Sequence, residues 1–253
     1  MKQHLFTLTV ALTAACFLSQ CTIPTSGGGG APSATKDAPF VNSLGMKFVP
    51  VPGTDILMCT TETTVAQYQA AGLGYQAPKF PQGSNHPAVN VSWNDAKTWC
   101  AWLSKRDGRK YRLPTDAEWS AAVGGSTYPW GNSWPPPNNV GNYAGQELRG
   151  STPAEQALLF KGYSLIGGFS DRHKFTSTGG GYPANGYGLH DLGGNAWEWC
   201  EDRHPDLQGE YRVMRGGSWY SVGQINLACS GRFDVGSIGK SIGGYGFRCV
   251  VVK

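Results

Sequence analysis

Apolar and polar positions along the chain predict short strands and a few helices, separated by long stretches of turns. The apolar runs at 48–51 and 56–58 are candidates for short strands. Thr115 with Glu118 forms a capping-box pattern that predicts a helix through Ala122. Beyond this point Gly, Pro, Asn and Trp recur so often that any strands must be short.

Two further helix starts carry capping residues. Thr63 precedes the pattern of a helix over 65–71. Ser92 followed by Asp95 resembles a capping box and predicts a helix that extends to about Lys105. The three-and-four spacing of apolar residues gives this helix one buried face. That face is formed by Ala96, Trp99, Cys100 and Leu103.

Composition favours a loop-rich fold that is ordered by large aromatic side chains. The 253 residues include 36 Gly, 16 Pro, 9 Trp and 11 Tyr, and only 15% are charged. This length allows one large domain, or two small ones, with a sizeable core. The net charge is +4, and no basic stripe is interleaved with aromatic residues, so no nucleic-acid partner is expected.

The first 20 residues have the pattern of a bacterial export signal. Lys2 precedes an apolar run at 5–18, which is too short to cross a bilayer because a spanning helix needs about 20 apolar residues. Cys21 follows this run and resembles the acylated cysteine of a lipobox, and Cys16 is the other candidate. The alternative is an ordinary secretory signal with incidental cysteines. The chain is expected to be exported in either case.

Residues 21–39 are rich in Gly, Ser and Pro, which predicts a tether between a lipid anchor and one domain over 40–253. Setting Cys16 and Cys21 aside leaves five cysteines. Because five is odd, at least one thiol is free or pairs between chains. The sequence holds no Cys-x-x-Cys motif and no His-Cys cluster, so zinc is not expected.

A series of short strings along the domain carries a family resemblance. The most distinctive are Arg-Leu-Pro-Thr-Asp-Ala-Glu-Trp at 112–119, Gly-Asn-Ala-Trp-Glu-Trp at 194–199, Arg-Gly-Gly-Ser-Trp at 215–219 and Gly-Phe-Arg at 246–248. Others lie at 61–68, 87–96, 128–131 and 185–189. In this order they resemble the formylglycine-generating-enzyme (sulfatase-modifying factor) superfamily over nearly all of 40–253. The resemblance implies an α+β fold of the C-type-lectin type, loop-rich with short strands and few helices.

The same resemblance argues against an enzyme. The oxidising members of the superfamily carry two cysteines shortly after the Gly-Gly-Ser string, and these bind copper because soft thiolates select Cu(I). Ser221 and Asn226 stand at those positions in this chain. No paired His, Ser/His/Asp set or Gly-rich phosphate loop replaces them, and the histidines at 86, 173, 190 and 204 are scattered. We therefore expect no catalytic residue and no required cofactor.

The resemblance also implies a disulfide between Cys100 and Cys249. Cys229 aligns with another family cysteine, but Val123 stands at the position of its partner. The pairing of Cys59, Cys200 and Cys229 stays open.

Structural calcium is a further implication of the resemblance, because the aligned positions mix carboxylates with backbone carbonyls as Ca²⁺ prefers. The first set comprises Asp191, Gly194, Ala196 and Glu198. A weaker second set comprises Asn142, Tyr143, Asp171 and His173. The alternative for the first set is that Asp191 and Glu198 cap turns or pair with arginine.

Several residues within the family strings are expected to be structural. Arg112, Arg215 and Arg248 lie in apolar surroundings, where each can satisfy buried carbonyls or a carboxylate such as Glu118 or Glu198. Trp197 and Trp199 alternate along the chain, so one is expected to face the core and the other a neighbouring loop.

The segment 213–249 is expected to form a variable ligand-binding face. Between its scaffold strings it mixes apolar, small and polar residues without strand or helix periodicity, and it is rich in aromatic residues, Ser and Gly, as adaptable binding loops are. The arrangement resembles the variable lipoproteins of diversity-generating retroelements, of the treponemal type. The residues expected to be diversified are Tyr220, Ser221, Val222, Ile225, Phe233, Asp234, Val235, Gly236, Ser237, Ile238, Ser241, Ile242, Gly243, Gly244 and Tyr245.

The sequence therefore predicts an exported, lipid-anchored receptor or adhesin that binds a macromolecule, a protein or a host-cell molecule. Tyr220, Phe233, Val235, Ile238, Ile242 and Tyr245 are expected to form a shallow apolar patch for it. The expected location is the outer cell surface, with the periplasmic face as the alternative, and the membrane is contacted through the lipid alone. Two other functions stay open: an enzyme of the same family with altered chemistry, and a structural or sugar-binding lipoprotein without diversification.

Overall fold

The computed structural model describes residues 32–152, 155, 164–233, 239 and 243–253. The chain divides into two compact units, Met1–Gly30 and Ala31–Lys253. The expected signal peptide and Cys21 lie outside the described residues, so the fold described below is that of the second unit. This unit begins earlier than the expected boundary at residue 40. Pro32 is buried, Ala34 packs against the main core, and Thr35 and Ala38 form a hydrogen-bonded turn.

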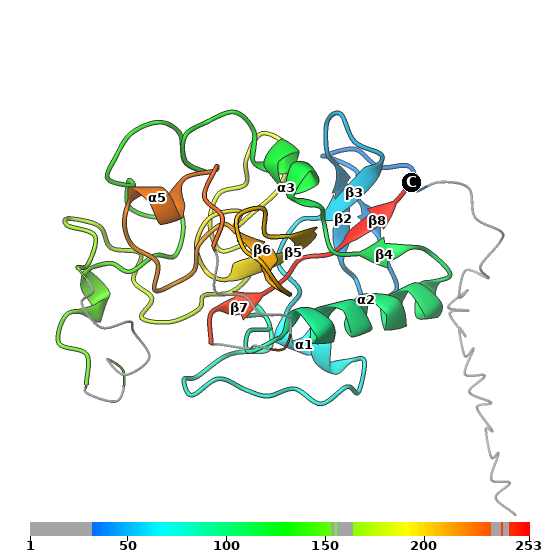
Figure 1. The fold of residues 1–253 in the computed structure, drawn as a ribbon, viewed down its shortest axis with the longest axis horizontal. Helices are drawn as coiled ribbons and strands as arrows, with labels where there is room; N and C mark the ends of the chain where they lie inside the picture. The colour runs from blue at the N-terminus through cyan, green and yellow to red at the C-terminus, as the bar shows by residue number, and fades with distance from the viewer. Residues whose placement is uncertain (1–31, 153–154, 156–163, 234–238, 240–242) are drawn as a thin grey trace, which may run out of the picture. The chain divides into compact units, whose positions relative to one another are not determined.

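The first sheet is antiparallel and has the strand order β1-β2-β3-β8-β4. The strands are β1 (Phe40–Val41), β2 (Lys47–Pro50), β3 (Ile56–Cys59), β4 (Tyr111–Arg112) and β8 (Val250–Val252). Met58 pairs with Val250, so the last strand of the chain lies between β3 and β4 (Figure 1). The two predicted strands at 48–51 and 56–58 are thus confirmed, each within one residue at either end.

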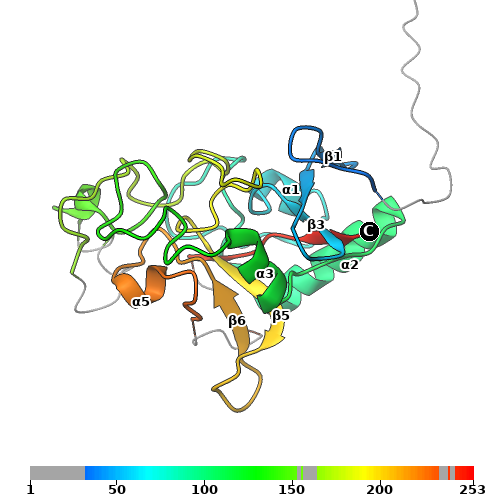
Figure 2. The same cartoon turned by 90° about the horizontal axis from the view of Figure 1, so that it is seen from above.

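The second sheet has the order β6-β5-β7. Its strands are β5 (Trp197–Arg203), β6 (Arg212–Arg215) and β7 (Tyr245–Gly246). Figure 2 shows β5 and β6 side by side as an antiparallel pair, and β7 joins β5 in parallel. Trp197 and Trp199 are both buried in the main core. The Trp197 ring stacks on Phe233, which lies in the loop after α5 (Gln224–Leu227), so one of the two rings faces a neighbouring loop as expected. The Trp199 ring packs against Tyr245 of β7.

Two of the three predicted helix starts are confirmed. Helix α2 (Trp93–Asp107) begins with a reciprocal capping box between Ser92 and Asp95, and α3 (Asp116–Val123) begins with one between Thr115 and Glu118. Helix α2 ends at Gly108, whose φ of +64° favours glycine.

Helix α1 (Val65–Gln69) is capped by Thr64 instead of Thr63, because Thr64 can exchange hydrogen bonds with Gln67 three residues later. Two further helical elements with described bounds are the 3₁₀ turn Gln146–Leu148 and the short helix α5 (Gln224–Leu227).

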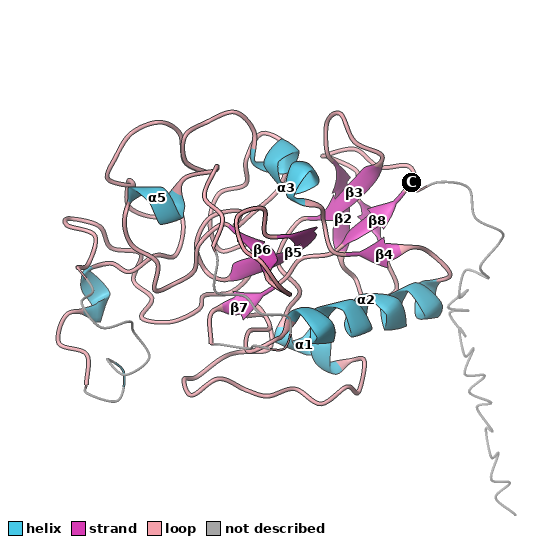
Figure 3. Ribbon diagram, viewed as in Figure 1, coloured by secondary structure: helices cyan, strands magenta, loops and turns pink. Residues whose placement is uncertain are grey.

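Loops make up much of the described chain, as Figure 3 shows, and they are ordered by packing instead of by long elements. The main core joins both sheets to α2 and is rich in aromatic rings, including the fully buried Trp99, Trp197, Trp199 and Trp219. A smaller cluster of Tyr128, Tyr143, Ile166, Phe169 and Leu227 lies under the loops. Within the part of the chain that the structure describes, every helix falls short of the length and apolarity that crossing a bilayer requires.

Candidate functional site

Ser221 and Asn226, the two positions that the resemblance aligns with copper-binding cysteines, differ in burial. Ser221 is 3% exposed, and its hydroxyl oxygen accepts a hydrogen bond from the Ser218 backbone N–H at 2.9 Å. Asn226 is exposed on α5, where its side-chain amide donates to the Val222 carbonyl at 3.2 Å. One position is thus a satisfied interior hydroxyl and the other a surface amide. Neither offers the soft sulfur ligand that Cu(I) requires.

The Gly-Gly pair before these residues allows the backbone to approach neighbouring segments closely. Gly216 and Gly217 have φ angles of +93° and +84°, which side chains rarely adopt. A Cβ atom on Gly216 would lie 3.0 Å from the Leu192 carbonyl oxygen, and one on Gly217 would lie 2.9 Å from Leu227. The turn therefore fits between the second sheet and α5 only without side chains.

The expected binding patch is only partly on the surface. Tyr220 and Tyr245 are 2% and 0% exposed and belong to the main core, so assigning them to the ligand-binding face was wrong. Tyr220 packs edge-on against Trp219, with ring centroids 5.0 Å apart. Tyr245 pairs with Trp197 in the β5–β7 ladder. Long-range packing, which sequence periodicity does not report, buries these rings.

Other expected positions are distributed between surface and interior. Ile225 is 83% exposed, the largest value among the exposed large apolar residues of the described chain. Val222, Phe233 and Gly243 are half-buried, and Ser221 and Gly244 are both buried. Asp234, Val235, Gly236, Ser237, Ile238, Ser241 and Ile242 lie outside the described residues.

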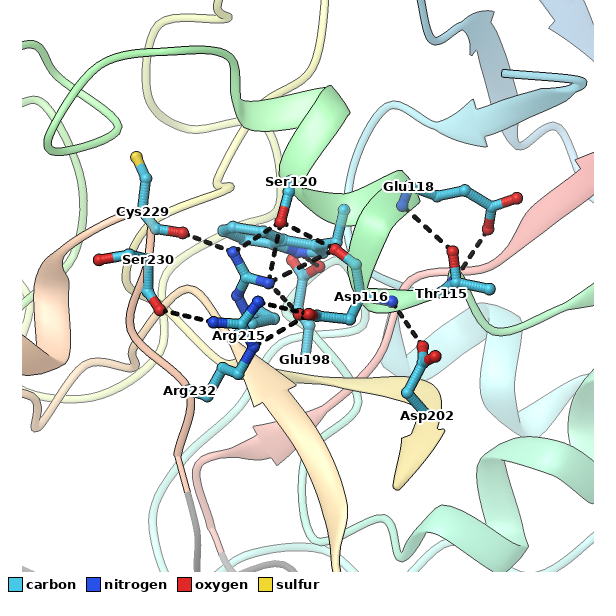
Figure 4. Close-up of polar contacts among 11 residues, drawn as sticks. Thr115, Asp116, Glu118, Ser120, Glu198, Asp202, Arg215, Cys229, Ser230 and Arg232 are labelled. Carbon is cyan, nitrogen blue, oxygen red and sulfur yellow. Dashed lines mark hydrogen bonds and ion pairs between the residues drawn. The ribbon is translucent and has the colours of Figure 1, made fainter. Parts of the chain in front are cut away.

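A charged network attaches the segment that follows β6 to the scaffold (Figure 4). Arg215 on β6 is 1% exposed and bonds through its guanidinium to the Asp116 carboxylate on α3 and, at 2.5 Å, to the Cys229 carbonyl. The other Asp116 oxygen accepts two hydrogen bonds from Arg232, at 2.9 and 2.6 Å. Asp116 thus lies between two arginines, and the Asp202 carboxylate accepts its backbone N–H at 2.6 Å.

This network has a buried part at Arg215 and a surface part at Arg232. The Arg215 guanidinium lies 4.5 Å from the centre of the Trp119 ring, in cation–π contact. Arg232 remains 36% exposed at its side chain. The network was not predicted, because nothing in the sequence pattern indicates that Asp116 and Arg232 pair with each other or with Arg215. Its partners are about a hundred residues apart.

A second arginine pair lies in the interior. Arg248 and Glu198 are both fully buried and share three hydrogen bonds of 2.6–2.9 Å. Arg248 also donates to the carbonyls of Cys59, His190 and Asp191. Burial and the adjacent Glu198 carboxylate act in opposite directions on the pKa of Arg248, and the carboxylate raises it overall.

The structural interpretation of the arginines is therefore confirmed for all three. Arg112 completes the set, with a bidentate contact to Glu118 at 2.7 Å.

The first calcium set does not fit a calcium ion in this arrangement, because Glu198 is already engaged. Both Glu198 oxygens accept hydrogen bonds from Arg248, and one of them also accepts the Trp119 indole N–H at 2.9 Å. A divalent ion there would compete with a buried guanidinium. The alternative expectation, that Glu198 pairs with arginine, is confirmed. Gly194 and Ala196 lie in the adjoining turn, where the Gly194 N–H donates to the Gly216 carbonyl.

The second calcium set is brought together around one loop crossing. The two Asp171 oxygens accept the backbone N–H groups of Tyr143 at 2.7 Å and His173 at 2.8 Å. Burial raises the pKa of Asp171 to about 7, and the nearby Glu147 carboxylate adds to this rise. The side-chain oxygen of Asn142 is buried and has no hydrogen-bond partner. Amide and carboxylate oxygens are the donors that Ca²⁺ accepts, so this set fits calcium in its chemistry.

No cluster of three His, Cys, Asp or Glu side chains suited to a metal occurs among the described residues. The second calcium set is no exception, because only two of its four residues, Asp171 and His173, are of these four types.

The structure does not contain the disulfide that the resemblance implies. Cys59, Cys100, Cys200, Cys229 and Cys249 are all free and buried. Cys59, Cys100 and Cys249 belong to the same core cluster, and the Cys59 N–H donates to the Cys249 carbonyl at 3.0 Å. Burial raises the pKa of Cys59 to about 11 and of Cys100 to about 12. The structure therefore has Cys100 and Cys249 as two buried thiols and does not show the bond that the resemblance implies.

Comparison with known proteins places this architecture in a family. The model of the sulfatase-modifying factor enzyme 1-like domain matches residues 34–253. A relative named inactive C-alpha-formylglycine-generating enzyme 2, from Bos taurus, is 36% identical over 170 residues, which cover 64% of this chain and 49% of the relative. The chain spans about half the length of the curated relatives it matches.

Solved structures share the fold at low sequence identity. PvdO from Pseudomonas aeruginosa superimposes with a TM-score of 0.60 at 22% identity, covering 78% of this chain and 80% of that one. Treponema denticola variable protein 1 superimposes with a TM-score of 0.57 at 23% identity, covering 78% and 84%. These likenesses agree with the α+β fold of the C-type-lectin type that the sequence predicts. The chain therefore belongs to the family of the sulfatase-modifying factor enzyme 1-like domain.

Proposed function

We propose that this protein is an exported, lipid-anchored binding protein that uses the family fold to present a surface for a macromolecular ligand, and that it does not oxidise sulfatase cysteines. The observation that carries the proposal is the pair Ser221 and Asn226. A buried hydroxyl bonded to Ser218 and an exposed amide on α5 replace the thiolates on which the oxidases depend. The name of the inactive bovine relative is consistent with loss of that chemistry within the family.

The binding surface is proposed to centre on α5 and the turn that follows it. Gln224, Ile225 and Asn226 are exposed there, and Ser230 and Arg232 are exposed just beyond. Exposed Ile225 is an apolar anchor of the kind that interfaces bury. The contacts of Arg215 and Arg232 with Asp116 hold this segment on α3, so the surface is presented by a rigid support.

Diversification by a retroelement is part of the proposal for the segment 213–249. The described part of this segment combines scaffold residues, which are buried, with exposed residues in the same stretch of chain. A rewriting mechanism that spares the fold is expected to act on the exposed set. The buried Tyr220 and Tyr245 are therefore proposed to be scaffold residues.

The oxidase alternative is tested with a sulfatase-derived peptide that contains the target cysteine. The purified protein is incubated with the peptide and Cu(I), and mass spectrometry follows conversion of the thiol to the aldehyde. We expect no conversion and a copper stoichiometry near zero. Conversion of the peptide, or one tightly bound copper per chain, would overturn the proposal.

Two further experiments test the remaining parts. Sequencing the locus should find a reverse transcriptase gene and a template repeat that matches codons 212–249 except at adenines, and its absence refutes diversification. Metabolic labelling with a fatty-acid analogue should modify the wild-type chain and the Cys16→Ser variant but not the Cys21→Ser variant. Labelling that survives Cys21→Ser contradicts the assigned lipid anchor.

A further inference from the structure

A cavity of about 250 Å³ lies where the end of α3, the segment 129–140 and the loop 183–193 meet. The exposed Pro183 and Ala184 are among its lining residues, so it is reached from solvent. None of the described residues of 213–249 lines it. The cavity is therefore separate from the proposed binding surface, and a ligand found there needs its own explanation.

Most of the residues that line the cavity are apolar. They include Val123, Pro129, Val140, Pro183, Leu189 and Leu192. Asn185 is polar, but its hydrogen-bonding groups serve the protein itself. Its amide N–H donates to the Ala122 carbonyl at 2.8 Å, and its oxygen accepts two backbone N–H groups. The wall thus offers a ligand apolar side chains beside a similar area of polar atoms.

Trp130 contributes an aromatic surface to the same wall. Tyr128 stacks on its ring with the centroids 4.7 Å apart and the planes 1° from parallel, and Tyr143 packs edge-on at 5.3 Å. The indole N–H is already bonded to the Ser133 carbonyl at 2.9 Å. What Trp130 can still offer a ligand is its π-system, which attracts cations.

Asp191 is the single ionisable residue among those that line the cavity. One of its carboxylate oxygens accepts the Gly180 N–H at 2.5 Å, and the other has no hydrogen-bond partner. The nearby Arg248 guanidinium bonds to the Asp191 carbonyl, and its ion pair is with Glu198. Burial raises the pKa of Asp191, and the Gly180 N–H and the nearby Arg248 offset this rise only in part. The protein's own groups therefore do not fully stabilise the ionised carboxylate, and a bound cation would favour that form.

We propose that this cavity binds a small organic cation, an amine or a quaternary ammonium compound with an apolar body. The Asp191 carboxylate supplies the opposite charge, Trp130 supplies a cation–π face, and the aliphatic wall covers the apolar body. An anion is disfavoured because no lysine or arginine lines the cavity and because α3 ends there, where the helix dipole is negative. An uncharged compound of the same shape would leave the orphaned carboxylate oxygen uncompensated.

The experiment uses three probes: choline, benzyltrimethylammonium and the uncharged carbon isostere of choline. Their binding to the wild-type protein is measured by changes in the NMR line shape of the probe and by tryptophan fluorescence. Both cations should bind with a dissociation constant of about 1 mM or tighter. The uncharged isostere should bind at least tenfold more weakly. Equal binding of choline and its isostere, or no binding of either cation, would overturn the proposal.

Two variants and one control locate the site. Asp191→Asn keeps the shape and the oxygen that accepts the Gly180 N–H, and Asn tolerates the φ of +53° at this position. It should weaken both cations at least tenfold. Asp206→Asn removes the same charge from an exposed residue outside the cavity and should leave binding unchanged. Val140→Phe, which narrows the cavity from a half-buried position, should weaken the larger cation more than choline. Equal binding by wild type and folded Asp191→Asn rules the site out.

Discussion

Ser221 and Ser218 form a closed turn in which the Ser221 hydroxyl accepts the Ser218 N–H and the Ser221 N–H donates to the Ser218 carbonyl at 2.8 Å. The Ser221 carbonyl in turn accepts the Ala144 N–H at 3.2 Å. Ser221 therefore has a structural role: its hydrogen bonds close the turn at Ser218 and join it to the loop at Ala144.

Replacing Ser221 tests this structural role. Ser221→Ala leaves the buried Ser218 N–H without its acceptor, so the free energy of unfolding should fall by about 1–3 kcal/mol. Urea denaturation of the purified protein measures the change. Ser230→Ala, at an exposed position, is the control and should stay within about 0.5 kcal/mol of the wild type. Equal stability of the two variants contradicts the role assigned to Ser221.

The Arg248–Glu198 pair should be costly to break. Glu198→Gln leaves a buried guanidinium without its counter-charge, and the free energy of unfolding should fall by about 3–5 kcal/mol. The Lys97–Glu201 pair, whose side chains are 34% and 33% exposed, provides the comparison. Glu201→Gln should cost about 0–1 kcal/mol. A loss in Glu198→Gln no larger than in Glu201→Gln would show that Arg248 is compensated by other groups.

The division of the variable segment into scaffold and surface is open to a paired test. Tyr245→Ala removes a fully buried ring from the core and should lower the free energy of unfolding by about 3–5 kcal/mol. Ile225→Asp changes an exposed side chain and should alter stability by about 0.5 kcal/mol or less. If Ile225→Asp destabilises the protein as much as Tyr245→Ala, α5 is packed and does not belong to the binding surface.

Acid should weaken the fold partly through His86. Burial, followed by the nearby His173, lowers the pKa of His86, and its ring nitrogen bonds to Thr176 at 3.1 Å. Because the folded-state pKa lies below the unfolded value of about 6.5, the unfolded chain takes up the proton first as pH falls. Stability is therefore complete above about pH 6.5 and declines below it. His86→Asn should flatten this decline in urea titrations between about pH 7.5 and 5, and parallel curves for the two proteins would exclude His86.

We propose calcium binding at the second set alone. Adding Ca²⁺ at about a hundred times its dissociation constant should raise the free energy of unfolding by about 2.7 kcal/mol. Asp171→Asn should abolish the rise because it removes the one carboxylate of the set, while Mg²⁺ at equal concentration should act weakly on the wild type. A calcium effect that persists in Asp171→Asn assigns the ion to another place.

Local sequence signals predicted the elements whose causes are local. The capping boxes at Ser92 and Thr115 and the two apolar runs gave α2, α3, β2 and β3, because each depends on residues within one turn or strand. The family resemblance supplied the fold class. It did not supply the pairing of β7 with β5, in which residues 197 and 245 meet in a parallel ladder.

The sequence indicated which residues stand at the two aligned positions, but it did not indicate which of them is exposed. Ser221 and Asn226 were found from their distance to the Gly-Gly-Ser string, yet nothing in that spacing shows that one is buried and the other exposed. The same limit explains the error over Tyr220 and Tyr245. Aromatic residues without periodicity occur in binding loops and also in irregular cores, and only contacts with Trp219 and Trp199 distinguish the two cases.

The shared carboxylate of Asp116 has a practical consequence for protein engineering. It holds Arg215 at the start and Arg232 near the end of one stretch of chain, so the exposed residues 223–226 within that stretch lie between two fixed points. A library confined to these exposed residues would vary in sequence without replacing the buried Trp219 and Ser221, which makes this chain a candidate for displaying artificial affinity reagents.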